Sequence, residues 1–390
     1  MPWRTGTVET ERGRFVLEAQ RSDLPFAELC RRHGISRPTG YKWLERASAE
    51  GLAGLQDRSR RPHSCPHATS EYVVKRILTI RRRRKWGARK IRTRLGKDPA
   101  ILVVPSIDTI HRILERHGEV EPRKPRRRRT HPGPPLPIPA EPNATWTADF
   151  KGEFRNLNGK LCYPLTVQDG HTRFLLECHG MLRLDLQETI QRFRYLFREY
   201  GLPQRIRTDN GHPFASNAIG RLSQLSVWWI RLGIIPELIE PGKPQQNGRH
   251  ERMHRDLHAD TASPPEHDLA AQQRSFNKFR RIYNHERPHE ALNMETPSER
   301  YRPSPRPYAE RLEPIEYPPH FEVRFVAQDS AIRWRNRKVF VSHVLAHEHV
   351  GLEQVADAVW SVYFGPVHLG WLDEADYRIM DVTERKRRRR

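Results

Sequence analysis

The sequence predicts a multidomain chain in which all-α modules come first, an α/β domain lies in the middle and a small β-barrel comes last. Three patterns predict this order. The N-terminal third contains short helices that begin at capping serines, the middle alternates strands with helices, and the C-terminal part carries short alternating strands separated by turns. A length of 390 residues is enough for several domains.

Changes in composition set the expected domain boundaries. Helical patterning ends where a basic, proline-rich segment begins, and a second proline-rich segment follows the α/β domain. The expected parts are two helix-turn-helix DNA-binding domains at 1–62 and 63–120, a basic linker at 121–142, the α/β domain at 143–302, a linker at 303–320, the barrel at 321–380 and a basic tail at 381–390.

The charge balance favours a polyanionic partner. Lys and Arg number 69 against 47 Asp and Glu, which gives a formal net charge of +22. No apolar run approaches the roughly 20 residues that a membrane span requires, and the first residues do not have the pattern of a signal peptide. We therefore expect a cytoplasmic protein with a nucleic-acid partner, no membrane partner and no small-molecule substrate.

The cysteines do not indicate a disulfide framework. Cys30, Cys65, Cys162 and Cys178 form no C-x-x-C pair, so we expect reduced, structural thiols. Residues 63–67 contain two histidines and a cysteine, as a zinc module does. A downstream cysteine pair is missing and prolines interrupt the segment, so we interpret it as linker.

The first helical module has the spacing of a helix-turn-helix unit. A helix from Phe26 to His33 ends at Gly34, and Ser36 caps the next helix. A plain three-helix bundle is the alternative interpretation. Basic residues around the second helix favour docking in the major groove of DNA. Those expected to contact DNA are Arg37, Lys42 and Arg46.

The second module repeats this plan. Ser106 caps a helix in which Ile107, Ile110 and Leu114 share a face, and another helix precedes it at 88–95. A cluster of cations before that helix is expected to bind DNA, with a solvated helix face as the alternative. Its members are Arg81, Arg82, Arg83, Arg84 and Lys85.

The linker arginines are expected to hold phosphates without reading sequence. A solvated spacer is the alternative for them. These residues are Arg126, Arg127, Arg128 and Arg129.

The α/β domain begins with a strand at 145–150, in which Trp146 and Phe150 lie on one face and Asp149 on the other. A later short strand delivers Asp209 at its end, and a helix near the end of the domain carries Glu251. The other expected elements are strands at 163–169, 173–179 and 234–238, and a helix at 185–200.

Asp149, Asp209 and Glu251 form the strongest candidate site. Each has an ordinary alternative explanation, namely an edge-strand surface residue, a turn, and an i,i+4 partner of Arg255. Taken together, at a strand, a strand end and a helix, they indicate a metal site, because Mg²⁺ prefers carboxylate ligands. We expect all three to be catalytic and to hold two Mg²⁺ ions, with Mn²⁺ as a substitute.

The residues around these acids carry a family resemblance. The phrases are WTADF around Asp149, RTDNG around Asp209, PQQNG before Glu251 and YNHERPH after it, with GLAGLQDRSRRP behind the first module. In these phrases the chain resembles bacterial insertion-sequence transposases of the three-acid (DDE) superfamily, which also contains retroviral integrases. The spacing between the last two acids is longer than is usual there, and the surplus is expected between Ala218 and Leu232.

The resemblance implies a ribonuclease-H-like catalytic core and a DNA transposase. Such an enzyme binds the terminal inverted repeats of a mobile element, cleaves DNA and transfers the cut strand into target DNA. A mobile element has two ends, whereas each chain has one set of three acids. This implies a homo-oligomer, a dimer or higher, assembled on double-stranded DNA. Residues placed to hold the phosphate or the DNA end are Lys243, Asn247 and Arg252.

Other functions remain open at this level. A catalytically inactive or domesticated DNA-binding regulator is the main alternative. A retroviral-type integrase is a closer rival, disfavoured by the absent zinc pattern and the tandem helical modules. Barrels like the one expected here follow the catalytic domain in related enzymes, and the arginines at 385–390 are expected to bind phosphates nonspecifically.

Overall fold

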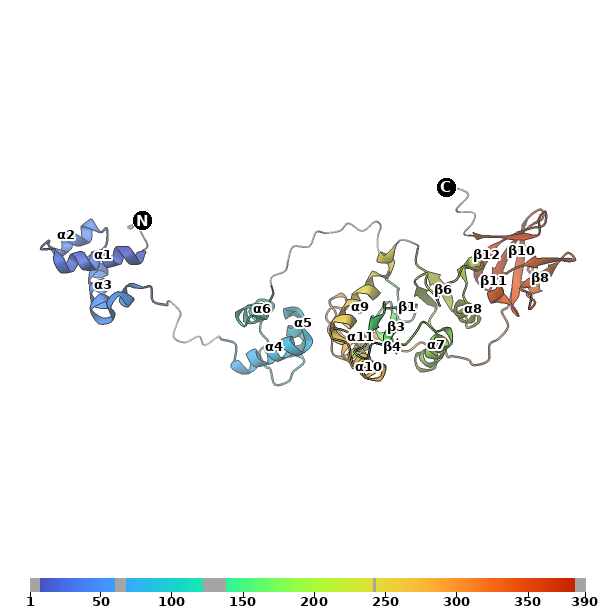
Figure 1. Ribbon diagram of the computed structural model, residues 1–390, viewed down its shortest axis with the longest axis horizontal. Coiled ribbons are helices and arrows are strands. Elements are labelled where there is room, and N and C mark those ends of the chain that lie inside the picture. Colours follow the sequence, from blue (N-terminus) through green and yellow to red (C-terminus); the bar gives the residue numbers. More distant parts are fainter. Residues whose placement is uncertain (1–7, 60–67, 122–137, 241–242, 383–390) are drawn as a thin grey trace. The chain divides into compact units, whose positions relative to one another are not determined.

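The computed structural model describes residues 8–59, 68–121, 138–240 and 243–382. The chain divides into two compact units, Met1–Ser70 and Glu71–Arg390. The elements of the first unit are the helices α1 (Val8–Arg21), α2 (Phe26–Arg32) and α3 (Arg37–Glu50), followed by the short 3-10 helix η1 (Gly51–Leu55) (Figure 1). Phe15, Leu29 and Trp43 form their buried core.

The helix-turn-helix expectation for this unit is confirmed. Ser36 caps α3 by accepting a hydrogen bond from the Thr39 amide at 3.3 Å, and Gly34 makes the turn with φ of +64°. The two helices pack closely, because a Cβ added at Gly40 would lie 2.8 Å from the Cys30 sulfur. A side chain at position 40 would therefore push α3 away from α2.

The second unit begins with another three-helix module. Its helices are α4 (Glu71–Arg84), α5 (Ala88–Gly96) and α6 (Ile107–Arg116). Ser106 caps α6 as expected, accepting from the Thr109 amide at 3.1 Å. Ile110 and Leu114 are buried, whereas Ile107, predicted to share their face of the helix, is 39% exposed. Ile107 lies in the first turn of α6, and Ile113 takes its place in the core.

A six-stranded mixed sheet follows, in the order β2-β3-β1-β5-β6 with β4 paired to β3. β1 runs antiparallel to β3 and parallel to β5, which in turn runs parallel to β6. The strands are β1 (Thr145–Phe150), β2 (Phe154–Arg155), β3 (Leu161–Asp169), β4 (Leu175–Met181), β5 (Arg205–Thr208) and β6 (Ile235–Leu238).

Helices cover both faces of this sheet. One buried cluster joins Trp146 and Leu165 of the sheet to Phe193 of α7 and Trp229 of α8, and another joins Cys178 to Met253 of α9 and Phe276 of α10. The helices are α7 (Leu186–Tyr200), α8 (Gln224–Arg231), α9 (Gly248–Thr261), α10 (Leu269–His285) and α11 (Pro297–Arg300), with the 3-10 turns η2 (Ile219–Arg221), η3 (Pro244–Asn247) and η4 (Glu290–Leu292). This mixed sheet with flanking helices is the expected ribonuclease-H-like architecture.

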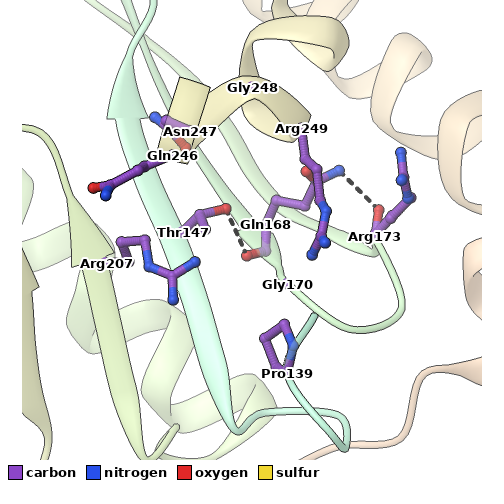
Figure 2. Close-up of a pocket in the computed structure, with 10 residues that line it drawn as sticks. All are labelled: Pro139, Thr147, Gln168, Gly170, Arg173, Arg207, Gln246, Asn247, Gly248 and Arg249. Atoms are coloured by element: carbon purple, nitrogen blue, oxygen red, sulfur yellow. Dashed lines mark hydrogen bonds between the residues drawn. The ribbon is translucent and has the colours of Figure 1, made fainter. Parts of the chain in front are cut away.

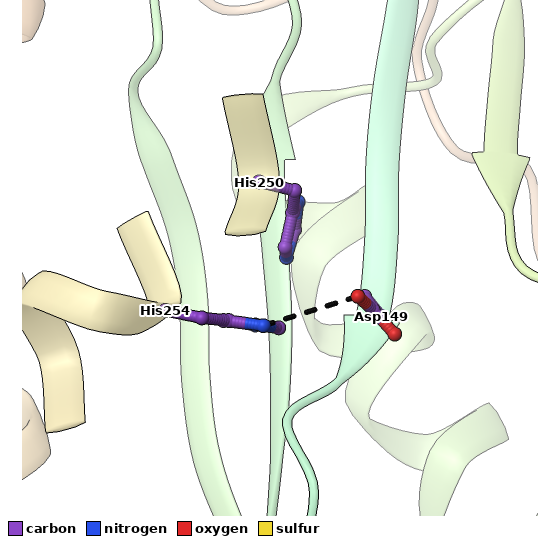
Figure 3. Close-up of side chains that lie close together, drawn as sticks. All are labelled: Asp149, His250 and His254. Atoms are coloured by element: carbon purple, nitrogen blue, oxygen red, sulfur yellow. Dashed lines mark ion pairs between the residues drawn. The ribbon is translucent and has the colours of Figure 1, made fainter. Parts of the chain in front are cut away.

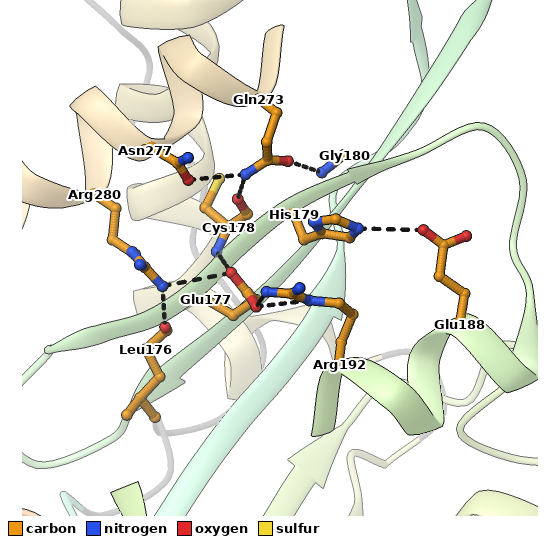
Figure 4. A network of polar contacts seen from close by, with 10 residues as sticks. All are labelled: Leu176, Glu177, Cys178, His179, Gly180, Glu188, Arg192, Gln273, Asn277 and Arg280. Carbon is orange, nitrogen blue, oxygen red and sulfur yellow. Dashed lines mark hydrogen bonds and ion pairs between the residues drawn. The ribbon is translucent and has the colours of Figure 1, made fainter. Parts of the chain in front are cut away.

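A buried carboxylate ties the two helical layers to the sheet (Figure 4). Glu177 on β4 is 1% exposed and pairs with Arg192 of α7, whose Nε donates at 3.0 Å. Arg280 of α10 donates to the Leu176 carbonyl at 2.7 Å and lies 3.5 Å from the Glu177 carboxylate. The charge of Glu177 is therefore shared between arginines from both sides of the sheet.

The C-terminal part forms sheets, but the expected closed barrel is not confirmed. Five antiparallel strands lie in the order β13-β12-β11-β10-β7, and β8 and β9 form a separate hairpin. Trp334 and Trp360 are core residues, and both indole N–H groups donate to Glu374. The strands are β7 (Glu322–Phe325), β8 (Ala331–Trp334), β9 (Arg337–Phe340), β10 (His349–Ala356), β11 (Val359–Phe364), β12 (Val367–Asp373) and β13 (Arg378–Asp381), with η5 at His343–Leu345.

The connecting segment 303–320 has no helix or strand, yet it lies against the α/β domain. The Ser304 amide donates to the Tyr200 carbonyl at 2.8 Å, and the Leu202 amide donates to the Arg306 carbonyl at 2.8 Å. The Arg306 guanidinium also donates to the Pro203 carbonyl at 2.7 Å. Residues of α8 share a buried cluster with the C-terminal sheet. The segment is therefore docked and does not act as a free tether.

Several expectations fall outside the described residues, namely Cys65 with the 63–67 segment, most of the basic linker and the tail at 385–390. The other three cysteines are free and buried thiols. None of the described helices is long and apolar enough to cross a bilayer.

Candidate active site

The fold brings the three predicted acids into one electrostatic neighbourhood. Ala148 pairs in register with Thr208 across the parallel strands β1 and β5, which lie about 4.8 Å apart, so the next residues, Asp149 within β1 and Asp209 just after β5, are neighbours. Glu251 lies in the first turn of α9. Burial, and then the negative charges of Asp209 and Glu251, raise the pKa of Asp149 to about 7.

Asn247 connects the start of α9 to the first acid. Its side-chain amide is 7% exposed and donates to Oδ2 of Asp149 at 3.1 Å. This bond holds the carboxylate in one orientation from the side of α9. Of the other two residues expected near the DNA end, Lys243 pairs with Glu240 at 2.5 Å and Arg252 is exposed.

Two buried histidines, His250 and His254, lie near Asp149. From the sequence, His250 was only a weak candidate for contact with the DNA end, and no role was predicted for His254. One ligand atom each of Asp149, His250 and His254 lies within 4.8 Å of the others (Figure 3). Nδ1 of His254 is 3.9 Å from Oδ2 of Asp149. The i,i+4 spacing of the two histidines on one helix face, next to Glu251, was the pattern that could have revealed them.

Hydrogen bonds hold both rings. The Thr166 hydroxyl contacts Nε2 of His250 at 2.6 Å and Nε2 of His254 at 2.7 Å, and it donates to the Asp149 carbonyl at 3.0 Å. A hydroxyl has one proton, so with the carbonyl as its acceptor both Nε2 atoms carry the protons. Nδ1 of His254 then has a lone pair on the side of Asp149.

Both ring nitrogens of His250 contact threonine hydroxyls, whereas Nδ1 of His254 faces Asp149. Nδ1 of His250 contacts the Thr147 hydroxyl at 2.9 Å, so neither nitrogen of this ring is available as a ligand without a rearrangement. Burial lowers the pKa of His254 to about 3, so its ring is neutral at pH 7. The neutral Nδ1 of His254 and the Asp149 carboxylate could both contribute to holding a divalent cation, and the carboxylate oxygens suit Mg²⁺.

Comparison with known families agrees with this geometry. The family description "Integrase core domain" matches residues 139–244 and, in a second match, residues 232–297. The chain carries an integrase core domain. Descriptions of a helix-turn-helix domain and a homeodomain-like domain match residues 11–63 and 39–114, so the helical modules before the integrase core are helix-turn-helix domains.

Two relatives come from bacterial insertion elements. The integrase-core chain is 28% identical over 260 residues to the insertion element IS407 uncharacterized 31.7 kDa protein of Burkholderia multivorans, covering 64% of this chain and 87% of the relative. It is 28% identical over 278 residues to the insertion element IS476 uncharacterized 39.2 kDa protein of Xanthomonas euvesicatoria, covering 69% and 76%.

Solved structures similar to the integrase core come from retroviruses. A chain of the simian T-cell lymphotropic virus intasome, in complex with a PP2A regulatory subunit, matches with a TM-score of 0.39 and 15% identity, covering 76% of this chain and 95% of that chain. The trimeric HTLV-2 integrase catalytic core in complex with magnesium matches with a TM-score of 0.31 and 16% identity, covering 42% and 99%.

The predicted DNA contacts of the first helix-turn-helix domain lie on α3. Arg37 and Lys42 are exposed, as DNA contact requires. Arg46 is half-buried, and its guanidinium carbon lies 5.1 Å from the centroid of the Trp43 ring. Arg46 therefore also packs against the domain's own core. The linker arginines from Arg126 to Arg129 lie outside the described residues.

The cation cluster at the end of α4 is divided between internal and exposed positions. The Arg81 guanidinium donates to the carbonyls of Lys85, Trp86 and Glu119, so it stabilises the second helical module through internal hydrogen bonds. Arg82 pairs with Glu119 at 2.6 Å, and Arg84 pairs with Glu286 of the integrase core at 2.6 Å. Arg83 and Lys85 are exposed.

The raised pKa of Asp149 predicts that the ionised form of this residue destabilises the folded protein, and that this destabilisation disappears at low pH. The folded pKa is about 7 against an ordinary value of 3.8, so the folded state binds more protons between these values and stability falls as pH rises through this window. We expect Asp149→Asn to raise the free energy of unfolding of the metal-free protein at pH 8 by up to about 4 kcal/mol, since one pKa unit is about 1.4 kcal/mol.

Thermal and urea unfolding of the metal-free protein at pH 4 and pH 8 measures this effect. The gain should be nearly lost at pH 4, where Asp149 is protonated in the folded state and about 40% protonated in the unfolded state. Mg²⁺ should stabilise the wild-type chain at pH 8 and leave the Asn variant unchanged. A gain of equal size at both pH values would contradict the electrostatic explanation.

Proposed function

We propose that this chain is a DNA transposase. In this proposal it binds the terminal inverted repeats of a mobile element, cleaves the DNA and joins the cut strand to target DNA. The observation that carries the proposal is the convergence of Asp149, Asp209 and Glu251: beyond the effect of burial, the charges of Asp209 and Glu251 contribute to raising the pKa of Asp149 to about 7. Holding mutually repelling carboxylates together costs free energy of folding, and this cost is explained if the carboxylates serve as a catalytic cation site.

The same site can serve two chemically similar steps. Water first attacks the phosphodiester at the element's end and a 3′-hydroxyl leaves. That hydroxyl then attacks a phosphodiester of the target, and another 3′-oxygen leaves. Two Mg²⁺ ions, or Mn²⁺ as substitutes, would activate the attacking oxygen and stabilise the leaving oxygen when held by the three acids.

The surrounding residues orient the acids. Asn247, at the N-cap of α9, donates to the Asp149 carboxylate, and Thr166 on β3 donates to the backbone carbonyl of Asp149. His254 presents a neutral nitrogen beside the same carboxylate, so it adds no positive charge to compete with a bound cation. These groups keep the first acid in place without neutralising it.

A direct assay decides between an enzyme and a regulator. Labelled duplexes with an element end are incubated with the full chain, a target plasmid and Mg²⁺, and the products are resolved on a denaturing gel. A transposase yields a shortened strand and a joined product, both lost on chelation. End binding without either product would support the alternative, an inactive DNA-binding regulator.

The helix-turn-helix domains are proposed to read the element's ends. Replacing Arg37 or Lys42 with Ala should weaken binding to the cognate end by about 1–3 kcal/mol for each genuine base contact, with a smaller loss on unrelated DNA. Titrations on both duplexes, with Arg14→Ala on α1 as a control for the loss of one exposed cation, measure the difference. Equal losses on the two duplexes would assign these residues to phosphates alone.

We also propose that the active form is a dimer or larger oligomer, assembled on DNA in the cytoplasm or nucleoid. The chain carries one set of three acids, whereas an element has two ends that react with one target. Because 303–320 is docked on the integrase core, this segment does not act as a tether to DNA held by another chain. Light scattering of the complex with paired ends counts the chains, and concerted transfer by a single chain would rule the oligomer out.

A further inference from the structure

A small pocket beside the acids is lined by three arginines that are distant in the sequence (Figure 2). Arg173 comes from the turn between β3 and β4, Arg207 from β5 and Arg249 from the first turn of α9. The pocket has a volume of about 120 Å³. A single water needs only about 10–15 Å³ on the same kind of measure, so a larger group fits. No described acidic residue lines the pocket.

The three guanidinium groups are close enough to influence one another. Burial, and then the charges of Arg173 and Arg207, hold the pKa of Arg249 below its usual range. Arg207 already pairs with Glu237 at 3.0 Å. Excess positive charge in a partly buried pocket favours an anion, and the planar guanidinium matches the oxygens of a phosphate.

The pocket is connected to the acids in two ways. Thr147 lines the pocket and lies two residues before Asp149 on β1, so both side chains face the same side, roughly 6–7 Å apart along the strand. Asn247 also lines the pocket and donates to Asp149. This separation is comparable to the distance between neighbouring phosphates of a nucleic-acid strand.

We propose that this arginine pocket, formed by Arg173, Arg207 and Arg249, binds the DNA phosphate next to the one that reacts at the acids. The proposal rests on the proposed transposase function and deepens it. By holding the neighbouring phosphate, the pocket selects which phosphodiester lies beside Asp149. An internal phosphodiester and a terminal 5′-phosphate present the same oxygens, so both are ligands of the class that the pocket accepts.

Single neutral phosphates test the proposal on the full chain. End duplexes carry a methylphosphonate at one position at a time, and binding is measured without metal for the wild-type chain, Arg249→Gln and Arg173→Gln. Arg274→Gln, an exposed arginine on α10, is the matched control. Arg207 is left intact because it pairs with Glu237 across β5 and β6.

We expect about a tenfold loss of wild-type affinity at one methylphosphonate position beside the cleavage site. Arg249→Gln should lose about tenfold on unmodified DNA and show no further loss at that position, and its plot of log Kd against log salt should be shallower by about one unit. Arg249→Lys should restore most of the salt dependence. The control should behave as the wild type at every position.

Duplexes with a 5′-phosphate or a 5′-hydroxyl then separate the two ligand sources. If replacing the terminal 5′-phosphate with a hydroxyl weakens binding, the pocket binds the terminal phosphate monoester. If an internal methylphosphonate weakens binding instead, the pocket binds an internal phosphodiester. If no single position distinguishes the wild type from Arg249→Gln, the proposal is overturned, provided that thermal unfolding shows the variant to be folded. Failure of the transposase proposal would appear separately, as an absence of strand transfer by a wild-type chain that still shows the position-specific loss.

Discussion

Asp149→Asn, Asp209→Asn and Glu251→Gln should each lower cleavage and strand transfer by on the order of 10³-fold or more while leaving end binding largely unchanged. Each substitution removes one negative oxygen ligand and changes the side-chain volume little. The helix-turn-helix domains are separate from the acids in the chain, so they should still hold the DNA end. Gel assays for products and titrations for binding measure the two properties on the same protein.

Glu266→Gln is the matched control, because this carboxylate is exposed and belongs to the same domain. It should keep wild-type activity. The three variants should also lose the stabilisation by Mg²⁺ that the wild type shows in thermal unfolding. Efficient strand transfer by any one of them in Mg²⁺ would remove that acid from the proposed catalytic set.

The second large effect concerns stability. Glu177→Gln should lower the free energy of unfolding by about 3–5 kcal/mol, because it leaves Arg192 and Arg280 without their buried counter-charge. The Glu177 side chain is 2% exposed and the two arginine side chains are 28% and 26% exposed, so water compensates only in part. Urea unfolding of the full chain, followed by fluorescence, measures the loss.

Glu188→Gln provides the comparison within the same network (Figure 4). The Glu188 carboxylate is 40% exposed and contacts His179 at 3.2 Å, so its loss should change stability by no more than about 1 kcal/mol. The folded fraction of Glu177→Gln should retain DNA binding through the helix-turn-helix domains. Equal, small losses for the two variants would show that the buried pair contributes little beyond its desolvation cost.

The sequence by itself determined the features that depend on local patterns. Ser36 and Ser106 predict where helices begin, because a side-chain oxygen just before a helix accepts a hydrogen bond from one of its free backbone amides. The alternation around Asp149 shows which face of β1 is buried. The family phrases around the three acids then identified an integrase core, and family comparison confirms that identification.

Only the tertiary structure decided the features that depend on contacts between distant residues. Arg173, Arg207 and Arg249 meet in one pocket, and Thr166 meets His250 and His254, although no local pattern relates them. The same reason explains why the expected barrel is not confirmed, why Arg81 bonds to carbonyls inside its own module and why 303–320 is docked. Strand pairing and side-chain burial are set by long-range packing, whereas capping and alternation are visible within a few residues.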